Sequence, residues 1–301
     1  MLQGFLQNLI IGIQSGAVYA LIAVGYTMVY GVLRLINFAH GDVYMLGAFV
    51  GLTLSERFGP VASKSPAGFA AIFVLTLITC SAVGMLIERL AYRPLRTAPR
   101  IAALITAIGV SLFLEALALL IWGPSPRFFP TLFELPTFKL LGLDLNAKYL
   151  LILGSSVVLM TALWYLVTRT RLGKAMRAVA WDREAAALMG INVDRIIGFT
   201  FGVGSALAAA AGMLVSALLN YKIDPYSGVF PGLKAFVAAV LGGIGNIPGA
   251  VLGGLVMGIA ETFVTASKFS SWRDAIAFVL LIVILICRPA GLLGRATVEK
   301  V

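Results

Sequence analysis

Residues 233–264 read LKAFVAAVLGGIGNIPGAVLGGLVMGIAETFV, an apolar run that a Gly-rich stretch interrupts at residues 242–249. Its first arm, Leu233 to Leu241, is too short to cross roughly 30 Å of hydrocarbon at about 1.5 Å per helical residue. Non-helical backbone at that depth is tolerated only where it is buried in protein or lines a polar cavity. The run therefore predicts a half-helix that stops near the middle of a membrane, a Gly-rich turn and a second arm that returns.

Apolar runs of membrane-spanning character surround this segment on both sides. We expect crossings at residues 5–30, 67–90, 101–121, 149–167, 196–219 and 275–287. A second interrupted run, residues 38–54, is short and begins with polar residues. The expected fold is an all-α polytopic membrane protein with about eight membrane segments, including interrupted or re-entrant half-helices, in a single transmembrane domain over residues 1–301.

The composition excludes a soluble domain, because only 12% of the residues are charged and 60% are hydrophobic, whereas soluble domains contain about 25% charged residues. The net charge of +10 would suggest nucleic acid on a soluble protein, but here it indicates membrane orientation, and no nucleic-acid partner is expected. Basic residues concentrate in 88–100, 168–195 and the tail from 288, which we place in the cytoplasm. The loops 122–148 and 220–231 and the N-terminus then lie outside.

The sequence places polar residues at the first interruption. Asn37, the single histidine His40, and Asp42 stand between two apolar stretches, where polar groups are costly and usually face a partner or a water-filled path. They are candidates, with Asn246 at the other break, for a substrate path, since helix N-termini at such breaks attract carboxylates. The alternative is local: Asn37 and Asp42 cap the next helix and His40 bonds a carbonyl.

A short helix is predicted within the basic segment 168–195. Asp182 suits an N-cap, Glu184 then lies in the first turn, and Gly190 suits the residue that ends the helix. From these residues alone, an ordinary loop helix is the simplest interpretation.

Small residues and carboxylates inside the apolar runs add two expectations. Glycine pairs four residues apart allow close helix packing; they are 12 and 16, 198 and 202, 249 and 253, and 254 and 258. Glu115 and Glu261 are either proton relays or hydrogen-bonding groups inside the bundle, while Glu88 lies at a membrane boundary beside basic residues. The two cysteines, Cys80 and Cys287, suggest neither a disulfide nor a metal site.

Four motifs in order resemble one transporter family. They are Asn37-Phe-Ala-His-Gly-Asp42, Glu88-Arg-Leu-Ala-Tyr-Arg-Pro-Leu-Arg96, Asp182-Arg-Glu-Ala-Ala-Ala-Leu-Met-Gly190 and Leu241-Gly-Gly-Ile-Gly-Asn-Ile-Pro-Gly249. Together they resemble the LivH-type permease of the high-affinity branched-chain amino acid ABC transporter, from about residue 14 to 291. The third resembles the EAA-type motif of ABC importers, although the Ile-x-Leu-Pro continuation is absent. The resemblance implies that an ATPase subunit docks on Asp182, Arg183, Glu184, Ala185, Ala186 and Gly190.

The resemblance also implies an assembly in the bacterial inner membrane. Its expected partners are a LivM-type second permease, two ATPases of the LivG and LivF types and a periplasmic substrate-binding protein. ATP and Mg²⁺ would bind to the ATPases, because Gly173-Lys174-Ala175 lacks the first glycine and the hydroxyl residue of a Walker A loop. This chain is therefore expected to be a transport subunit and not an enzyme, with no cofactor, metal or catalytic residue of its own.

Three other functions fit parts of the pattern. A permease of the same family for urea or short-chain amides would share the motifs. An ion-coupled secondary transporter for amino acids also uses paired breaks, and it would transport without ATPases. A purely structural membrane subunit would have little use for two polar breaks.

Overall fold

The computed structural model describes residues 2–35, 37–63, 65–96, 98–130, 136–140 and 143–294. Its long helices are α1 (Leu2–Leu33), α2 (His40–Ser63), α3 (Pro66–Ile87), α4 (Arg100–Trp122), α5 (Ala147–Arg169), α8 (Val193–Leu218) and α10 (Ile247–Thr265). The shorter helices are η1 (Glu88–Tyr92), η2 (Arg93–Leu95), α6 (Arg171–Trp181), α7 (Arg183–Leu188), α9 (Val229–Gly242), η3 (Ser270–Trp272) and α11 (Ala275–Cys287). A hairpin of β1 (Thr137–Leu140) and β2 (Leu143–Asn146) precedes α5.

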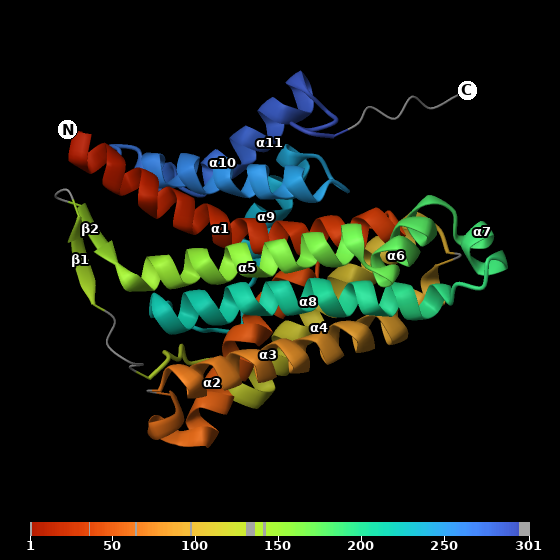
Figure 1. Cartoon of the computed structure of the whole chain (residues 1–301), viewed down its shortest axis with the longest axis horizontal. Helices are drawn as coiled ribbons and strands as arrows, with labels where there is room; N and C mark the ends of the chain where they lie inside the picture. Colours follow the sequence, from red (N-terminus) through yellow and green to blue (C-terminus); the bar gives the residue numbers. More distant parts are fainter. Residues whose placement is uncertain are drawn as a thin grey trace.

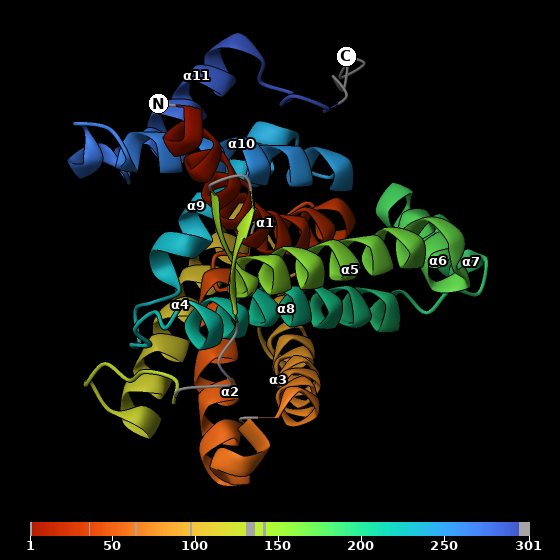
Figure 2. The same ribbon diagram turned by 60° about the vertical axis from the view of Figure 1, so that its left-hand side comes forward.

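Helices α1 and α8 form the centre of the bundle. Within their most apolar windows, 72% of α1 and 89% of α8 is buried, while α10 and α11 lie on one side and α2 and α3 on the other (Figures 1 and 2). Six helices are long and apolar enough to cross a membrane, and α9 and α11 are shorter apolar helices. The predicted all-α membrane fold is confirmed. One difference is that α10 is a full-length helix, whereas the predicted crossing at 275–287 is one of the short ones.

Glycines bring α1 and α10 into backbone contact. A Cβ on Gly16 would lie 2.8 Å from the Leu255 Cα, and one on Gly258 would lie 2.2 Å from the Gly16 nitrogen. Such close approach lets van der Waals contact replace the hydrophobic drive that is absent between helices in lipid. The predicted packing role of the pairs 12 and 16 and 254 and 258 is therefore confirmed, and their partner is another helix of the same chain.

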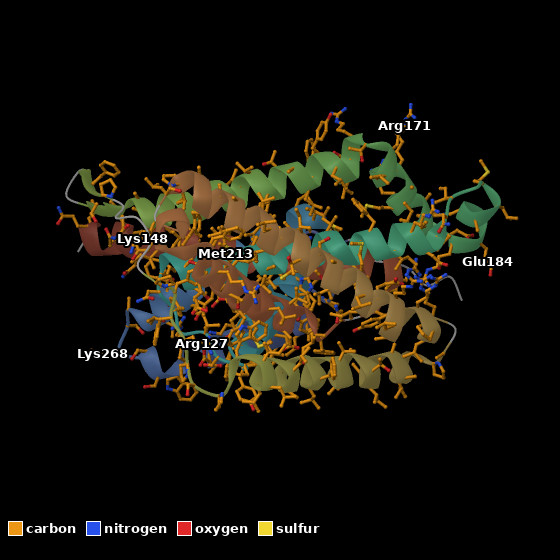
Figure 3. All side chains as sticks on the ribbon, turned by 90° about the horizontal axis from the view of Figure 1, so that it is seen from below. Arg127, Lys148, Arg171, Glu184, Met213 and Lys268 are labelled. Carbon is orange, nitrogen blue, oxygen red and sulfur yellow. The ribbon has the colours of Figure 1, made fainter. Side chains whose placement is uncertain are left out.

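The bundle has two chemically different ends, which α8 separates by about 39 Å. Glu184 and Arg171 mark what we call the basic end, and Arg127, Lys148 and Lys268 mark the cavity end (Figure 3). The segments that contain residues 88–96, 168–195 and 288–294 all lie at the basic end: Arg96 reaches Asp194, and the carbonyl of Leu293 accepts from Asn246. The loop strand at Arg127 pairs with Ile223 at the cavity end.

Two non-helical segments enter the bundle from opposite ends and meet inside it. We call residues 34, 35 and 37–39 the first break and residues 219–228 the second break; Arg34 and Asn220, next to the ends of α1 and α8, have positive φ angles of 55° and 54°. The first break leads to the start of α2 and the second to the start of α9. They meet at Gly41 and Gly228, where a Cβ on Gly228 would lie 2.2 Å from the Gly41 carbonyl oxygen. The first turns of α2 and α9 therefore lie beside each other inside the bundle.

This arrangement corrects the predicted position of the Gly-rich turn. Gly245 lies beside Gly31, near the basic end of α1, so α9 ends there and does not stop halfway. A short helix was correctly expected, but the second break carries the chain inward before α9 begins at Val229, so the start of α9, and not its Gly-rich end, lies where the two breaks meet. The turn at residues 242–249 therefore needs no burial at mid-membrane depth.

Candidate functional site

Helix α7 lies at the basic end, with large exposed apolar side chains at its end and on the residues that flank it. The Asp182 carboxylate accepts from the backbone N–H groups of Glu184 and Ala185 at 2.9 and 3.0 Å, and Gly190 has a φ of 81°, as predicted for a cap and a stop. Trp181 and Leu188 are each 89% exposed and Met189 is 83% exposed. Large apolar side chains this exposed, on a segment that lies between two spans, are typical of a protein-binding surface.

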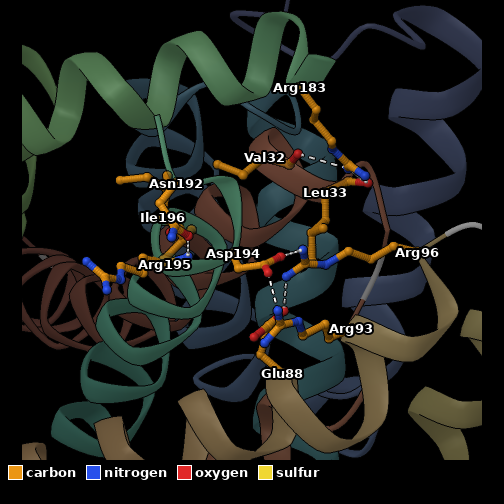
Figure 4. Close-up of polar contacts among 11 residues, drawn as sticks. Val32, Leu33, Glu88, Arg93, Arg96, Arg183, Asn192, Asp194, Arg195 and Ile196 are labelled. Carbon is orange, nitrogen blue, oxygen red and sulfur yellow. Dashed lines mark hydrogen bonds and ion pairs between the residues drawn. The ribbon is translucent and has the colours of Figure 1, made fainter. Parts of the chain in front are cut away.

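Arg183 connects α7 to the end of α1. Its guanidinium donates to the carbonyl oxygens of Leu33 at 2.9 Å and Val32 at 3.2 Å (Figure 4). These carbonyls belong to the last turn of α1, where backbone acceptors lack helical partners and a cation is favourable. Partial burial, followed by the charges of Arg96 and Arg34, lowers the pKa of Arg183. The first break begins directly after these carbonyls. Arg183 therefore bonds α7 to the residues that immediately precede the first break.

An ionic cluster joins the start of α8 to the segment after α3. The Asp194 carboxylate accepts from Arg93 and, at 2.5 Å, from Arg96, and Arg96 also donates to Glu88 (Figure 4). Asn192 caps α8 by accepting from the backbone N–H of Arg195 at 3.0 Å. Glu88 therefore pairs with Arg96, one of the basic residues beside it in the sequence.

Side chains from other helices hold the polar residues of the first break. Tyr92 donates to the Asn37 side chain at 2.7 Å, and Ser111 of α4 donates to Asp42 at 2.5 Å. His40 makes a backbone hydrogen bond with Ile22 and packs edge-on against Tyr26. The local alternative thus describes His40, but the Asn37 side chain bonds Tyr92 and not the next helix.

A small cavity of about 180 Å³ lies where the two breaks meet. Asp42 and Glu115 are its carboxylates, and its other walls are mostly apolar or glycine. The structure brings Asp42 of the predicted path to this cavity with Glu115, whose role the sequence left open. Asn246 lies elsewhere: it caps α10 and donates to Leu293 at the basic end. The path residues therefore do not form one cluster.

A larger cavity of about 600 Å³ opens at the cavity end. Its lining combines aromatic, proline and charged residues from α1, the second break, α9 and the segment before α11. Beside it the Glu261 carboxylate accepts from Tyr19 at 2.6 Å, from Lys234 at 2.8 Å and from Arg273. Lys234 also contacts Asp274 at 2.6 Å. We call these five residues the charge network.

The sequence indicated only one member of the charge network. Glu261 was expected as a possible hydrogen-bonding group inside the bundle, and that alternative holds. Lys234, 6% exposed, carried a signal, because it is a lone cation inside an apolar run and needs a buried partner. Arg273 and Asp274 resembled ordinary interfacial residues. Among the described residues, no three His, Cys, Asp or Glu side chains form a group that could hold a metal ion.

Comparisons with known proteins agree over almost the whole chain. A family model described as "Branched-chain amino acid transport system / permease component" matches residues 8–285. The high-affinity branched-chain amino acid transport system permease protein BraD of Pseudomonas aeruginosa is 44% identical over 304 residues, covering 99% of this chain and 98% of that protein. LivH of Escherichia coli K12, whose name describes the same system, is 42% identical over 308 residues with the same coverage.

A solved structure supports the fold alone. PsaBC from Streptococcus pneumoniae in complex with Fab aligns with a TM-score of 0.50 and 13% identity, covering 95% of this chain and 92% of that one. The match of the family model across most of the chain, together with relatives above 40% identity, is decisive for the family. This chain is a multi-pass, predominantly helical membrane protein that belongs to the permease component family of branched-chain amino acid transport systems.

Proposed function

We propose that this chain is the transmembrane permease subunit of an ATP-driven importer for branched-chain amino acids such as leucine, isoleucine and valine. The observation that carries the proposal is the 42–44% identity, over 99% of the chain, to permeases named for that transport. No relative reported above is named for urea or amides, and the exposed helix α7 favours a partner-driven importer over a self-sufficient ion-coupled transporter.

The proposed assembly contains a second permease of the LivM type, two ATPases of the LivG and LivF types, and a periplasmic binding protein. ATP and Mg²⁺ belong to the ATPases, since this chain has no complete Walker A loop. The basic end faces the cytoplasm, as its basic segments favour, and the cavity end faces the periplasm. In this orientation α7 meets the ATPases and the large cavity meets the binding protein.

The contacts of α7 supply a route from the ATPases to the inside of the permease. A displacement of α7 pulls on the end of α1 through Arg183 and on the start of α8, which follows α7 in the chain and is bonded through Asp194 to the segment after α3. Tyr92 of that segment contacts Asn37 in the first break, and the break positions the start of α2. Closure of the ATPases would thereby change the breaks that flank the substrate path, for which we retain Asn37, His40 and Asp42.

Co-purification tests the docking surface with two matched tryptophans. Trp181, on the α7 side, and Trp272, at the cavity end, are 89% and 65% exposed. We expect Trp181→Ala to reduce the amount of ATPase recovered with the detergent-extracted permease at least about tenfold, as for a buried hot-spot tryptophan. Trp272→Ala should leave recovery unchanged.

ATP-driven leucine uptake, measured in vesicles that contain the full assembly, tests the transport function itself. If the wild-type permease recovers no ATPase, or if this chain alone takes up leucine without ATP, the proposed function is wrong. If Trp181→Ala recovers as much ATPase as the wild type, the docking site is wrong while the transport assignment stands.

A further inference from the structure

The large cavity at the cavity end presents charges of both signs on adjacent residues. Arg273 and Asp274 both line it, immediately before α11. On each of these two side chains, one polar group is hydrogen-bonded to the charge network and, among the described residues, another is free. Arg273 uses its Nε to donate to Glu261, and Asp274 uses Oδ1 to accept from Lys234. Within the described chain, the terminal amino groups of Arg273 and the second oxygen of Asp274 have no hydrogen-bond partner.

Buried residues hold this pair of charges in place. The side chains of Lys234 and Glu261 are only 7% and 5% exposed, whereas those of Arg273 and Asp274 are 44% and 57% exposed. Lys234 lies between the two acidic groups, because its ammonium contacts both Glu261 and Asp274. Two fixed, buried charges therefore orient two solvent-accessible charges, which is how a binding site is made rigid before its ligand arrives.

The chemistry of the site matches a zwitterion. The four ionic side chains of the network sum to zero charge, so the site favours neither a free anion nor a free cation as a whole. A guanidinium with two open amino groups binds a carboxylate in a planar fork, and a free carboxylate oxygen accepts from an ammonium group. An α-amino acid carries these two groups on neighbouring atoms.

We propose that the large cavity binds the zwitterionic main-chain groups of an α-amino acid, with its carboxylate on Arg273 and its ammonium group on Asp274. This inference rests on the proposed function for the identity of the substrate and adds where the substrate is first held. The remaining wall includes Tyr44, Tyr226 and Phe230, which give an apolar surface for a side chain.

The size of the cavity predicts what the site does not recognise. At about 600 Å³ it is much larger than one leucine, so no wall closes tightly around the side chain. A transport site must also release its substrate onward, which favours weak binding. The site therefore recognises the charged main-chain groups and not the side chain. Leucine and alanine should consequently bind with similar affinity.

A cysteine reporter measures binding directly. In a background of Cys80→Ala and Cys287→Ser, Ser227→Cys places a thiol on the cavity wall. Ser270→Cys, which lies at the same end but is exposed outside the lining, is the matched control. The assembled importer is expressed in spheroplasts washed free of binding protein, and both thiols are labelled with a membrane-impermeant maleimide. Leucine should slow labelling at residue 227 and leave residue 270 unaffected.

Charge-deleted ligands and variants identify the contacts. Leucinol lacks the carboxylate and 4-methylpentanoate lacks the ammonium group, so each should need at least about tenfold higher concentration than leucine for equal protection. Arg273→Gln and Asp274→Asn should each raise the leucine requirement about tenfold. Arg273→Lys should give an intermediate rise, since it keeps the charge without the fork. Lys268→Gln removes a cation at the same end, outside the lining, and should change nothing.

Each outcome decides the inference. If leucine does not slow labelling of the Ser227→Cys reporter with an otherwise intact cavity, or if leucinol protects it equally well, the proposed site is wrong. This comparison of ligands needs no further variant, so it decides the question even when a charge variant fails to fold. ATP-driven leucine uptake after binding protein is restored separates the two proposals. Uptake without protection overturns the site alone; protection without uptake overturns the transport function alone; the loss of both overturns both.

Discussion

The first break and the second break enter the bundle from opposite ends and begin alike, but their surroundings differ. Each has a left-handed residue, Arg34 or Asn220, near the end of the preceding helix, and the breaks meet at Gly41 and Gly228. Around the first break, side chains of other helices bond Asn37 and Asp42. The second break instead forms part of the wall of the large cavity. The two breaks therefore serve different purposes: the first is a fixed link toward α7, and the second forms part of the wall of the large cavity.

Ion pairs at the two ends differ in their exposure to solvent. At the basic end, the pair of Arg93 with Asp194 is 48% and 43% exposed, and solvent screening leaves such pairs weak, whereas the neighbouring pair of Arg96 with Glu88 is 14% and 4% exposed. The pair of Lys234 with Glu261 near the second break is nearly excluded from solvent. Removal of one partner is therefore expected to cost more in the buried pairs than in the exposed one, and the following predictions are given in order of decreasing effect.

The largest effect is expected from Glu261→Leu. This substitution removes the acceptor shared by Tyr19, Lys234 and Arg273; the buried Lys234 then keeps only the partly exposed Asp274 as an ionic partner. Breaking a buried ion pair from one side costs about 3–5 kcal/mol, so thermal unfolding in detergent should occur at a clearly lower temperature.

Replacement of both partners provides the control for that prediction. Lys234→Met combined with Glu261→Leu removes the buried charges together, and it should recover much of the lost stability because neither ion is left uncompensated. A Glu261→Leu protein as stable as the wild type would contradict the importance of the network. A double variant less stable than Glu261→Leu would contradict the explanation that an uncompensated buried charge causes the loss of stability.

Gly228→Val tests the meeting point of the two breaks. Its side chain would collide with the Gly41 backbone, where even a Cβ would lie 2.2 Å from the carbonyl oxygen, and overpacking of this kind costs about 1–3 kcal/mol. Gly109→Val on α4 is the control, because nothing lies within 4 Å of a Cβ there. Thermal unfolding should separate the two variants, and equal stability would show that the breaks can move apart freely.

Arg183→Ala tests the link from α7 to the first break. The variant should still recover the ATPases, because Trp181, Leu188 and Met189 remain, but leucine uptake per ATP hydrolysed should fall about tenfold, as expected for the loss of charge-assisted bonds worth about 1.5–3 kcal/mol. Arg195→Ala is the control, since no side-chain bond of Arg195 is recorded within the described chain. Unchanged coupling in Arg183→Ala would show that motion reaches the bundle by another route.

Much of the fold follows from the sequence because membrane spans are long and strongly apolar. The ends of α3, α4, α5 and α8 lie within three residues of the predicted runs. The cap at Asp182 and the stop at Gly190 also follow from local chemistry. These features depend on interactions within a few residues, which sequence patterns report well.

The position of the second break could not be predicted in the same way. The Gly-rich turn at 242–249 looked like the interruption inside the bundle, yet the chain enters the bundle in the segment before α9, where Gly228 packs on Gly41 nearly two hundred residues away. The charge network likewise joins residues of α1, α9, α10 and the start of α11. Only the tertiary structure decides which lone charges in apolar runs become partners.

The smallest effect concerns Asp274, on the rim of the network. Its hydrogen bond from Lys234 lowers the pKa of the carboxyl below its ordinary value, against the opposing effect of partial burial. A depressed folded pKa means that the stabilisation is complete above the unfolded pKa of about 3.9 and is lost as pH falls through the lower folded pKa. The difference in melting temperature between the wild type and Asp274→Asn should therefore be constant above about pH 5 and shrink below about pH 4. Because the side chain is 57% exposed, that difference in melting temperature should be small compared with the effect of Glu261→Leu. A difference that grows on acidification would show that the pH dependence comes from another carboxylate of the network.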